Sequence, residues 1–263
     1  MTLKIVNGTY GYIQNEPLFS HLDFEVKEGS ILTILGANGV GKTTLLKCIL
    51  KFYKWQKGHT LINGKPTDKM SNTEFWKCIS YVPQAKHTIF PYSVLDMVLM
   101  GRAPNLGFVS MPKKEDIEMA QQVIDEIGIS SITHQSCGAI SGGELQLVLI
   151  ARALVSQPKI LILDEPESNL DMKNQLLILD ILQKLKEENG ITCIINTHYP
   201  NHALRISDDT LILGKNKKHV FGSTHSVITE ENIRRYFDVS TEIIQCKREG
   251  RDTPILFPIK IAN

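Results

Sequence analysis

The 263-residue sequence has no hydrophobic run long enough to cross a membrane. Its first residues, MTLKIVNGTYGY, lack the basic segment followed by a long apolar segment that a signal peptide needs. A membrane-spanning helix takes about 18 consecutive apolar residues. Runs such as Ile160 to Leu163 and Cys193 to Ile195 have only the length of buried strands. We therefore expect a protein that is soluble by itself.

The sequence also lacks an excess of charge of either sign and lacks a cysteine framework. Twenty-nine basic and 28 acidic residues give a formal net charge of +1, which offers no electrostatic basis for wrapping nucleic acid or coating an anionic membrane. The five cysteines are scattered, odd in number and without CxxC spacing. This pattern favours free thiols in a reducing cytosol over a disulfide or a zinc site.

The pattern of apolar residues predicts an α/β protein. Near the N-terminus, the strand-like segments Leu3 to Val6 and Leu22 to Val26 predict a small antiparallel sheet. Further along, apolar runs alternate with helical patterns, which is typical of a parallel α/β sheet. These runs are Ile31 to Leu35, Ile79 to Val82, Ile160 to Leu163, Thr192 to Asn196 and Thr210 to Leu213.

The middle of the chain is predicted to be helical. The patterns at Val94 to Gly101, Lys113 to Ile127 and Gly142 to Val155 are not interrupted by a convincing strand. We interpret residues 88–155 as a helical lobe inserted into one α/β domain that spans residues 1–240. Residues 241–263 mix short apolar runs, charges and two prolines, and form a C-terminal extension for which the sequence indicates no role.

A phosphate-binding loop follows the first buried run. The pattern G-x-x-x-x-G-K-[ST] is met between an apolar strand and a helical pattern, which is the context that the motif requires. Its glycines let backbone N–H groups surround a phosphate, the lysine adds a positive charge, and the threonine offers a hydroxyl to Mg²⁺. A chance match is the alternative. The candidate nucleotide-binding residues are Gly36, Ala37, Asn38, Gly39, Val40, Gly41, Lys42, Thr43 and Thr44.

Two adjacent acids follow another buried run, Ile160 to Leu163. Isolated carboxylates are costly to bury, so packing alone does not explain the two acids. Neighbouring strand residues point in opposite directions, so each acid can take a different role. Asp164 would lie near Mg²⁺, and Glu165 would reach an attacking water. The alternative is a strand that ends in a solvated acidic turn. Together with the phosphate-binding loop, Asp164 and Glu165 predict a P-loop nucleoside triphosphatase.

The segment Ile140 to Leu145, ISGGEL, resembles the signature of the ABC ATPase family, usually written LSGGQ. Serine and two glycines at the start of a helix form a second anion-binding end, although a plain serine cap is the alternative. The resemblance extends through about residue 225. It implies an adenine-stacking role for Tyr12, with Tyr10 as a near neighbour. The other family positions are Gln84 in the Q-loop, Ser141, Gly142, Gly143 and Glu144 in the signature, Asp171 in the D-loop and His198 in the switch segment.

The resemblance implies an ABC fold with an antiparallel β-subdomain and a helical subdomain, and a mechanism based on ATP and Mg²⁺. Two copies would dimerise head to tail, with each ATP between the phosphate-binding loop of one copy and Ser141 to Gly143 of the other. Glu165, His198 and Gln84 would be catalytic, and Thr43, Gln84 and Asp164 would hold Mg²⁺. Transmembrane permease subunits would place the protein at the cytoplasmic face of the membrane, with an extracytoplasmic substrate-binding protein as an indirect partner.

Three positions depart from the common family pattern: Glu144, Leu147 and Glu167. We expect them to tune the activity, because the phosphate, metal and water ligands are all present. The segments Ser93 to Pro104 and Thr197 to Ala203 are similar to the importer branch for iron-siderophores, haem, cobalamin and molybdate. This similarity implies an iron chelate as the cargo, with cobalamin, haem or an oxyanion as the alternatives. The alternatives are the ATPase of an efflux pump, an ABC ATPase that acts on DNA or ribosomes, and an ATP-binding regulatory module without turnover.

Overall fold

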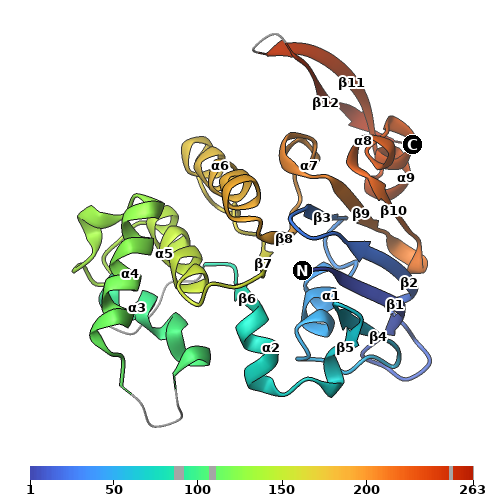
Figure 1. Ribbon diagram of the computed structural model, residues 1–263. Helices are drawn as coiled ribbons and strands as arrows, with labels where there is room; N and C mark the ends of the chain where they lie inside the picture. The colour runs from blue at the N-terminus through green and yellow to red at the C-terminus, as the bar shows by residue number, and fades with distance from the viewer. Residues whose placement is uncertain (86–91, 107–110, 249–250, 263) are drawn as a thin grey trace. The chain divides into compact units, whose positions relative to one another are not determined.

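The computed structural model describes residues 1–85, 92–106, 111–248 and 251–262 (Figure 1). These residues divide into two compact units. The first consists of Met1–Lys69 and Ile194–Asn263, and the second of Met70–Cys193. Within the described ranges, no helix combines the length and the apolar character needed to cross a bilayer. All five cysteines are free.

The first unit contains an antiparallel sheet with strands in the order β2-β1-β4-β5. Strand β2 alternates buried and exposed residues, as expected for a sheet with one covered face. The two predicted strands are present, and both are longer than predicted. Strand β4 was not predicted, because its sequence KGHTLI is half polar. The bounds are β1 (Leu3–Tyr10), β2 (Phe19–Val26), β4 (Lys57–Ile62) and β5 (Lys65–Pro66).

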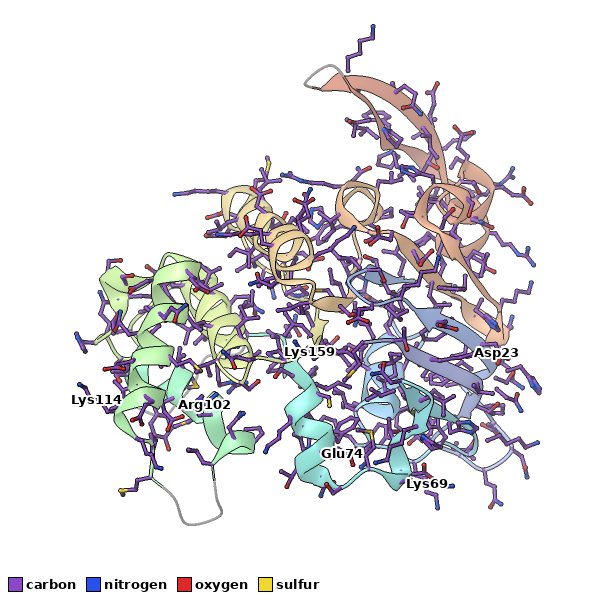
Figure 2. The ribbon with its side chains drawn as sticks, viewed as in Figure 1. Asp23, Lys69, Glu74, Arg102, Lys114 and Lys159 are labelled. Atoms are coloured by element: carbon purple, nitrogen blue, oxygen red, sulfur yellow. The ribbon has the colours of Figure 1, made fainter. Side chains whose placement is uncertain are left out.

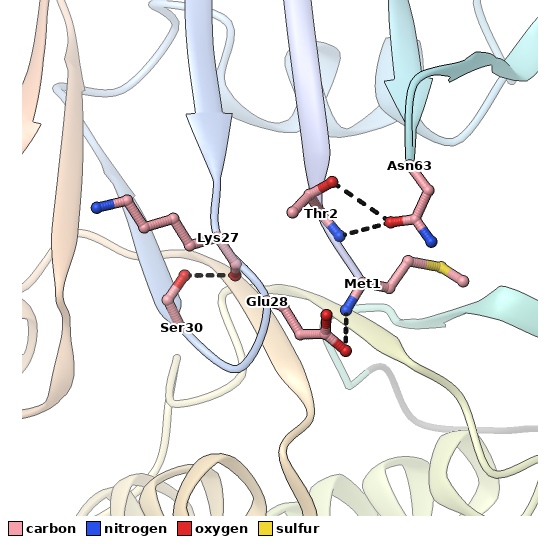
Figure 3. A network of polar contacts seen from close by, with 6 residues as sticks. All are labelled: Met1, Thr2, Lys27, Glu28, Ser30 and Asn63. Atoms are coloured by element: carbon pink, nitrogen blue, oxygen red, sulfur yellow. Dashed lines mark hydrogen bonds and ion pairs between the residues drawn. The ribbon is translucent and has the colours of Figure 1, made fainter.

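Polar contacts tie the start of β1 to two neighbouring turns (Figure 3). The amino group of Met1 lies 2.7 Å from a carboxylate oxygen of Glu28. The backbone N–H of Thr2 donates to Asn63 Oδ1 at 2.9 Å, and the Thr2 hydroxyl donates to the same atom at 3.3 Å. Exposed contacts of this kind contribute little free energy, but they fix where the first strand begins.

Buried strands form a second layer of the first unit. All five residues of β3 are buried; β3 pairs in parallel with β9 and is followed in the strand order by β8. Buried and mostly apolar strands of this kind are typical of a parallel sheet covered on both faces. The runs predicted at Ile31 to Leu35, Thr192 to Asn196 and Thr210 to Leu213 are confirmed. The strands are β3 (Ile31–Leu35), β8 (Thr192–Asn196), β9 (Asp209–Leu213) and β10 (His219–Ser223). The helices are α1 (Lys42–Ile49), α7 (Pro200–Ile206), α8 (Thr224–Val227) and α9 (Glu230–Phe237), with 3₁₀ turns η1 (Thr67–Lys69) and η4 (Lys215–Lys217).

The C-terminal extension is a β-hairpin of β11 (Val239–Arg248) and β12 (Arg251–Ile261), which projects from the first unit in Figure 1. Leu256 anchors it in a buried cluster with residues of α7 and α9. The Asn201 side chain pairs with the edge of β12, because Nδ2 donates to the Leu256 carbonyl at 3.0 Å and Oδ1 accepts from the Leu256 N–H at 2.8 Å. One amide side chain thus takes the place of a neighbouring strand.

The second unit combines two parallel strands with five α-helices among its described residues. The predicted strands are present, and between residues 92 and 154 the described chain contains no named strand. The strands are β6 (Ile79–Val82) and β7 (Ile160–Asp164). The helices are α2 (Asn72–Cys78), α3 (Val94–Leu99), α4 (Lys114–Ile127), α5 (Gly142–Leu154) and α6 (Met172–Asn189), with the 3₁₀ segments η2 (Met100–Asn105) and η3 (Ser130–Ile132).

The predicted helix at Val94 to Gly101 is shorter than expected, because α3 ends at Leu99 and η2 follows it. The backbone at Gly101 packs so closely on α5 that a Cβ there would lie 1.8 Å from the carbonyl oxygen of Arg152. A glycine is needed at such a contact, and the proline at position 104 also disfavours a continued α-helix.

Arg102, labelled in Figure 2, holds η2 against its neighbours. Its Nε lies 2.8 Å from Asp116 Oδ1 on α4, and one terminal nitrogen donates to the Val155 carbonyl after α5 at 3.1 Å. The backbone N–H of Lys113 and the Arg102 guanidinium lower the pKa of Asp116. Because the folded state favours the ionised carboxylate, this contact adds stability above the unfolded pKa of Asp116 and loses it as the pH falls.

We predict that Asn201→Asp loosens the hairpin without unfolding the protein. A second carboxylate oxygen would face the Leu256 carbonyl in place of a donor, and losing such a contact costs about 1–3 kcal/mol. Trypsin cleavage at Lys247 and Lys260 of the full chain should become about tenfold faster, since cleavage follows the population of the opened form. Asn72→Asp, at an exposed helix start, is the matched control. Hairpin cleavage at the wild-type rate in Asn201→Asp would contradict this role of the side chain.

Candidate nucleotide-binding site

The phosphate-binding loop of the first unit follows β3 directly. Gly36 has φ of 149°, and a Cβ there would lie 2.4 Å from the carbonyl oxygen of Leu213 at the end of β9. The close approach of these two strand ends therefore requires glycine at position 36. Gly39 and Gly41 also have positive φ, 82° and 104°, so the backbone winds tightly before it enters α1.

Helix α1 begins with an end that is suited to an anion. Its N-cap is Gly41, which supplies no side-chain hydrogen bond to the first turn. A Cβ at this position would lie 2.5 Å from Leu18 Cδ2. The first N–H groups of a helix carry the positive end of its dipole. A glycine cap has no side chain that competes for those groups, and phosphate is the ligand that such ends commonly bind.

Lys42 is fixed over this loop. Its Nζ donates to the carbonyl of Gly36 at 2.8 Å and to that of Ala37 at 3.2 Å, and the residue is only 5% exposed. Nζ also lies 3.3 Å from Nδ1 of His198, which follows β8. An ammonium group has only donors, so Nδ1 is the acceptor and the imidazole carries its proton on Nε2. The site therefore holds a positive charge and a second N–H donor.

The hydroxyls after Lys42 also have partners within the first unit. The Asn196 amide nitrogen lies 3.5 Å from Thr43 Oγ1, and Thr44 Oγ1 lies 2.7 Å from the Tyr12 hydroxyl. The second contact joins the predicted adenine-stacking residue to the helix that begins the phosphate site. Tyr12 and the phosphate-binding loop are therefore close in space, as the resemblance implies.

The structure favours Tyr12 over Tyr10 as the base-stacking residue. The Tyr10 ring is already stacked on Tyr53, with centroids 5.3 Å apart and planes at 3°. Tyr12 is 64% exposed, and its ring lines a hollow of 750 Å³ together with Lys217. Aromatic faces that remain open to solvent can accept a base.

The second unit carries the predicted acidic pair. All residues of β7 are buried, including Asp164, which accepts a hydrogen bond from the Tyr81 hydroxyl at 3.3 Å. Burial raises the pKa of Tyr81, and the neighbouring Asp164 carboxylate raises it further. Tyr81 is thus a neutral donor that orients one oxygen of Asp164. The sequence pattern does not predict Tyr81 as a partner of Asp164.

Glu165 has an unusual backbone conformation. Its φ is 50°, which is uncommon for a residue with a side chain and is often found at functional sites. The Ser168 hydroxyl donates to Glu165 Oε2 at 3.0 Å, and the Ser168 N–H donates to the Glu165 carbonyl at 3.1 Å. This tight turn holds the Glu165 carboxylate beside Ser168. Gln84, two residues after β6, is half-buried.

The signature segment caps α5. Ser141 accepts the N–H of Glu144, and Glu144 Oε2 accepts the Ser141 N–H at 2.8 Å and the Ser141 hydroxyl at 2.7 Å, which completes a capping box. Hydrogen bonds from the Ser141 side chain and backbone lower the pKa of Glu144. Glutamate at this departure from the family pattern therefore places a negative charge beside Ser141.

The signature approaches Asn174 on α6, which in turn contacts the D-loop residue Asp171. A Cβ at Gly143 would lie 2.6 Å from Asn174 Nδ2. The Asn174 amide in turn donates to Asp171, which caps α6 through the Asn174 N–H at 2.8 Å. Gln175 donates to the carbonyls of Glu167 and Leu170. The sequence pattern does not indicate the roles of Asn174 and Gln175, because nothing in an isolated helix pattern distinguishes them.

Each unit thus brings together part of the predicted set. In the first unit, Lys42, Thr43 and Thr44 contact His198, Asn196 and Tyr12 in turn. The second unit holds Gln84, the signature, the acidic pair and Asp171.

Comparison with known proteins agrees with this arrangement. The sequence profile of the ABC transporter family matches residues 19–168. The molybdate import ATP-binding protein MolC of Haemophilus influenzae is 37% identical over 89% of this chain and 87% of its own length. An iron chelatin transport ATP-binding protein of Helicobacter pylori is 36% identical over 93% and 96%. A solved structure described as an inward-facing metal-chelate type ABC transporter is 33% identical, covers 98% of this chain and 97% of its own, and has a TM-score of 0.88.

The chain belongs to the ABC transporter family and is an ATP-binding ATPase subunit of that family.

We predict that Lys42→Ala weakens ATP binding by at least tenfold, because the site loses the cation that its own carbonyls hold in place. Titration of the purified full chain with ATP measures the affinity directly. Lys47→Ala, which removes an equal charge from the last turn of α1, is the control and should bind ATP within about twofold of the wild type. Equal affinities for the wild type and Lys42→Ala would rule out the assigned role.

Proposed function

We propose that this protein is the ATP-hydrolysing subunit of an importer for a metal chelate, with an iron-siderophore as the first candidate cargo. The observation that carries the proposal is the fixed position of Lys42 Nζ between the Gly36 carbonyl and His198 at a glycine-capped helix end. A buried ammonium held beside the first N–H groups of a helix is suited to the β- and γ-phosphates of a nucleotide.

We also propose a magnesium ion that is shared with the substrate. No group of three or more His, Cys, Asp or Glu side chains that could hold a metal occurs in the described parts of the chain. Mg²⁺ commonly takes only one or two protein oxygens and completes its shell with waters and phosphates. We assign the Thr43 hydroxyl, Asp164 and Gln84 to it. When bound, the ion neutralises charge on the phosphate oxygens.

Glu165 is assigned as the general base that activates the attacking water. The Ser168 hydroxyl donates to Oε2 of Glu165 and so orients its carboxylate, and a positioned carboxylate can accept the proton of that water. The Nε2–H of His198 is assigned to the γ-phosphate, where it stabilises the negative charge that develops during transfer. These groups position the water and polarise it, and they form no covalent bond to the phosphate.

Closure requires a second copy of this chain. Ser141 and Gly142 are exposed at the start of α5, and nothing lies within 4 Å of a Cβ at Gly142. We assign this end to the γ-phosphate of an ATP bound by the other copy, with Asp171 at the same interface. ATP then joins the two copies, and its hydrolysis lets them separate.

The membrane partner is proposed to be a permease, which places the protein at the cytoplasmic face of the membrane. Support comes from relatives named for the transport of molybdate and iron chelatin and from the metal-chelate transporter structure. An extracytoplasmic binding protein would deliver the cargo. Isolation of the native complex, followed by ATPase assays with iron-siderophores and with molybdate, tests the cargo. If molybdate alone stimulates ATP hydrolysis, molybdate replaces the iron chelate as the proposed cargo. Co-purification with a subunit of an efflux pump would overturn the proposal that the complex is an importer.

We predict that Glu165→Gln keeps ATP binding, lowers hydrolysis by more than 100-fold and accumulates an ATP-bound dimer. The amide cannot accept the proton from water, so ATP is not hydrolysed and the dimer stays closed. Hydrolysis assays and light scattering with ATP and Mg²⁺ measure both effects. Glu187→Gln, on the exposed surface of α6, is the matched control with normal turnover. Wild-type turnover in Glu165→Gln would refute the assignment of the base.

A further inference from the structure

A buried amide links the signature helix to the segment that carries Gln84. Gln146 lies on α5 and is only 1% exposed. Its Oε1 accepts the backbone N–H of Ala85 at 3.1 Å. Ala85 is the residue after Gln84, so one hydrogen bond connects α5 to the backbone of the Q-loop. The sequence carries a weak sign of this role, since Gln146 is the one polar residue in the stretch from Leu145 to Ala151.

Gln146 is a costly residue for packing alone. Its Nε2 is buried and has no hydrogen-bond partner among the described residues. A buried polar group without a partner costs about 1–3 kcal/mol, and an apolar side chain of the same shape avoids this cost. Stability therefore does not account for an amide at this position. Its oxygen acts on one particular neighbour, the N–H beside Gln84.

Helix α5 is joined to the β6 region at a second point. The hydroxyls of Ser156, after the helix, and Ser80, on β6, lie 2.8 Å apart, and Ser156 also donates to the Ala153 carbonyl at 3.0 Å. The two attachments lie at opposite ends of β6, because Ser80 is on the strand and Ala85 follows it. A displacement of α5 relative to β6 is therefore transmitted to Ala85 through the Gln146 amide.

We propose that Gln146 is a positioning residue that transmits the state of the signature end, Ser141, to the catalytic Gln84. This inference rests on the proposed function of these two groups. Ser141 and Gln146 are five positions apart on α5, which is about 7.5 Å along a helix axis. A packed helix moves as a unit, so engagement of Ser141 by a second copy shifts the Gln146 oxygen and with it the N–H of Ala85.

The test is a double-mutant cycle on ATP hydrolysis by the full chain, with Gln84→Ala and Gln146→Met. Methionine keeps the length and volume of glutamine and removes the acceptor. We expect Gln146→Met to lower kcat about tenfold, to leave KM for ATP within about threefold, and to leave Tm unchanged or raised. The double variant should fall within about twofold of the more impaired single variant, since both substitutions break one linkage.

Val148→Ala on the same helix is the control, because Val148 is fully buried and is assigned no part in the reaction. It should lower Tm, leave kcat within about twofold, and combine multiplicatively with Gln84→Ala. A lower Tm with normal kcat in Gln146→Met, or multiplicative losses in the double variant, would overturn the positioning role. Normal kcat in Gln84→Ala would instead refute the proposed function of Gln84 itself.

Discussion

The arrangement of the first unit depends on one buried cation. Lys42 lies almost wholly out of solvent, and an ammonium without partners would be too costly there. Two loop carbonyls and one imidazole nitrogen compensate it. Those contacts need glycine at position 36, where the loop passes the end of β9, and at position 41, where Leu18 packs against α1. The geometry of the strands and loop thus places a positive charge where a phosphate would need it.

In the second unit, neutral side chains orient the candidate functional groups. Tyr81 orients Asp164, Ser168 orients Glu165, and Asn174 joins the signature to the D-loop. Asp164 and Glu165 therefore each have a supporting hydrogen bond that limits their rotamers. Such support is what gives an active site its defined geometry. Gln146 gives similar support to the backbone of the Q-loop, the segment that carries Gln84.

The motifs and most of the buried strands could be predicted from the sequence, because fully apolar runs and a phosphate-binding loop have strong local patterns. The sequence did not predict β4, the hairpin or the early end of α3. Strand β4 is half polar, the hairpin depends on Asn201 and Leu256, and α3 ends where Gly101 meets the backbone of α5. These features are set by tertiary contacts. For the same reason Tyr81, Asn174 and Gln146 were missed, since their roles arise from partners distant in the chain.

The central claim is that each ATP is held by the phosphate-binding loop of one copy and the signature of another. Mixing Lys42→Ala with Ser141→Arg tests it directly, because each variant alone has two defective sites whereas a mixed dimer keeps one intact site. The account predicts that two nearly inactive preparations recover substantial ATP hydrolysis when mixed. A mixture that hydrolyses ATP only at the mean of the two separate rates would contradict it.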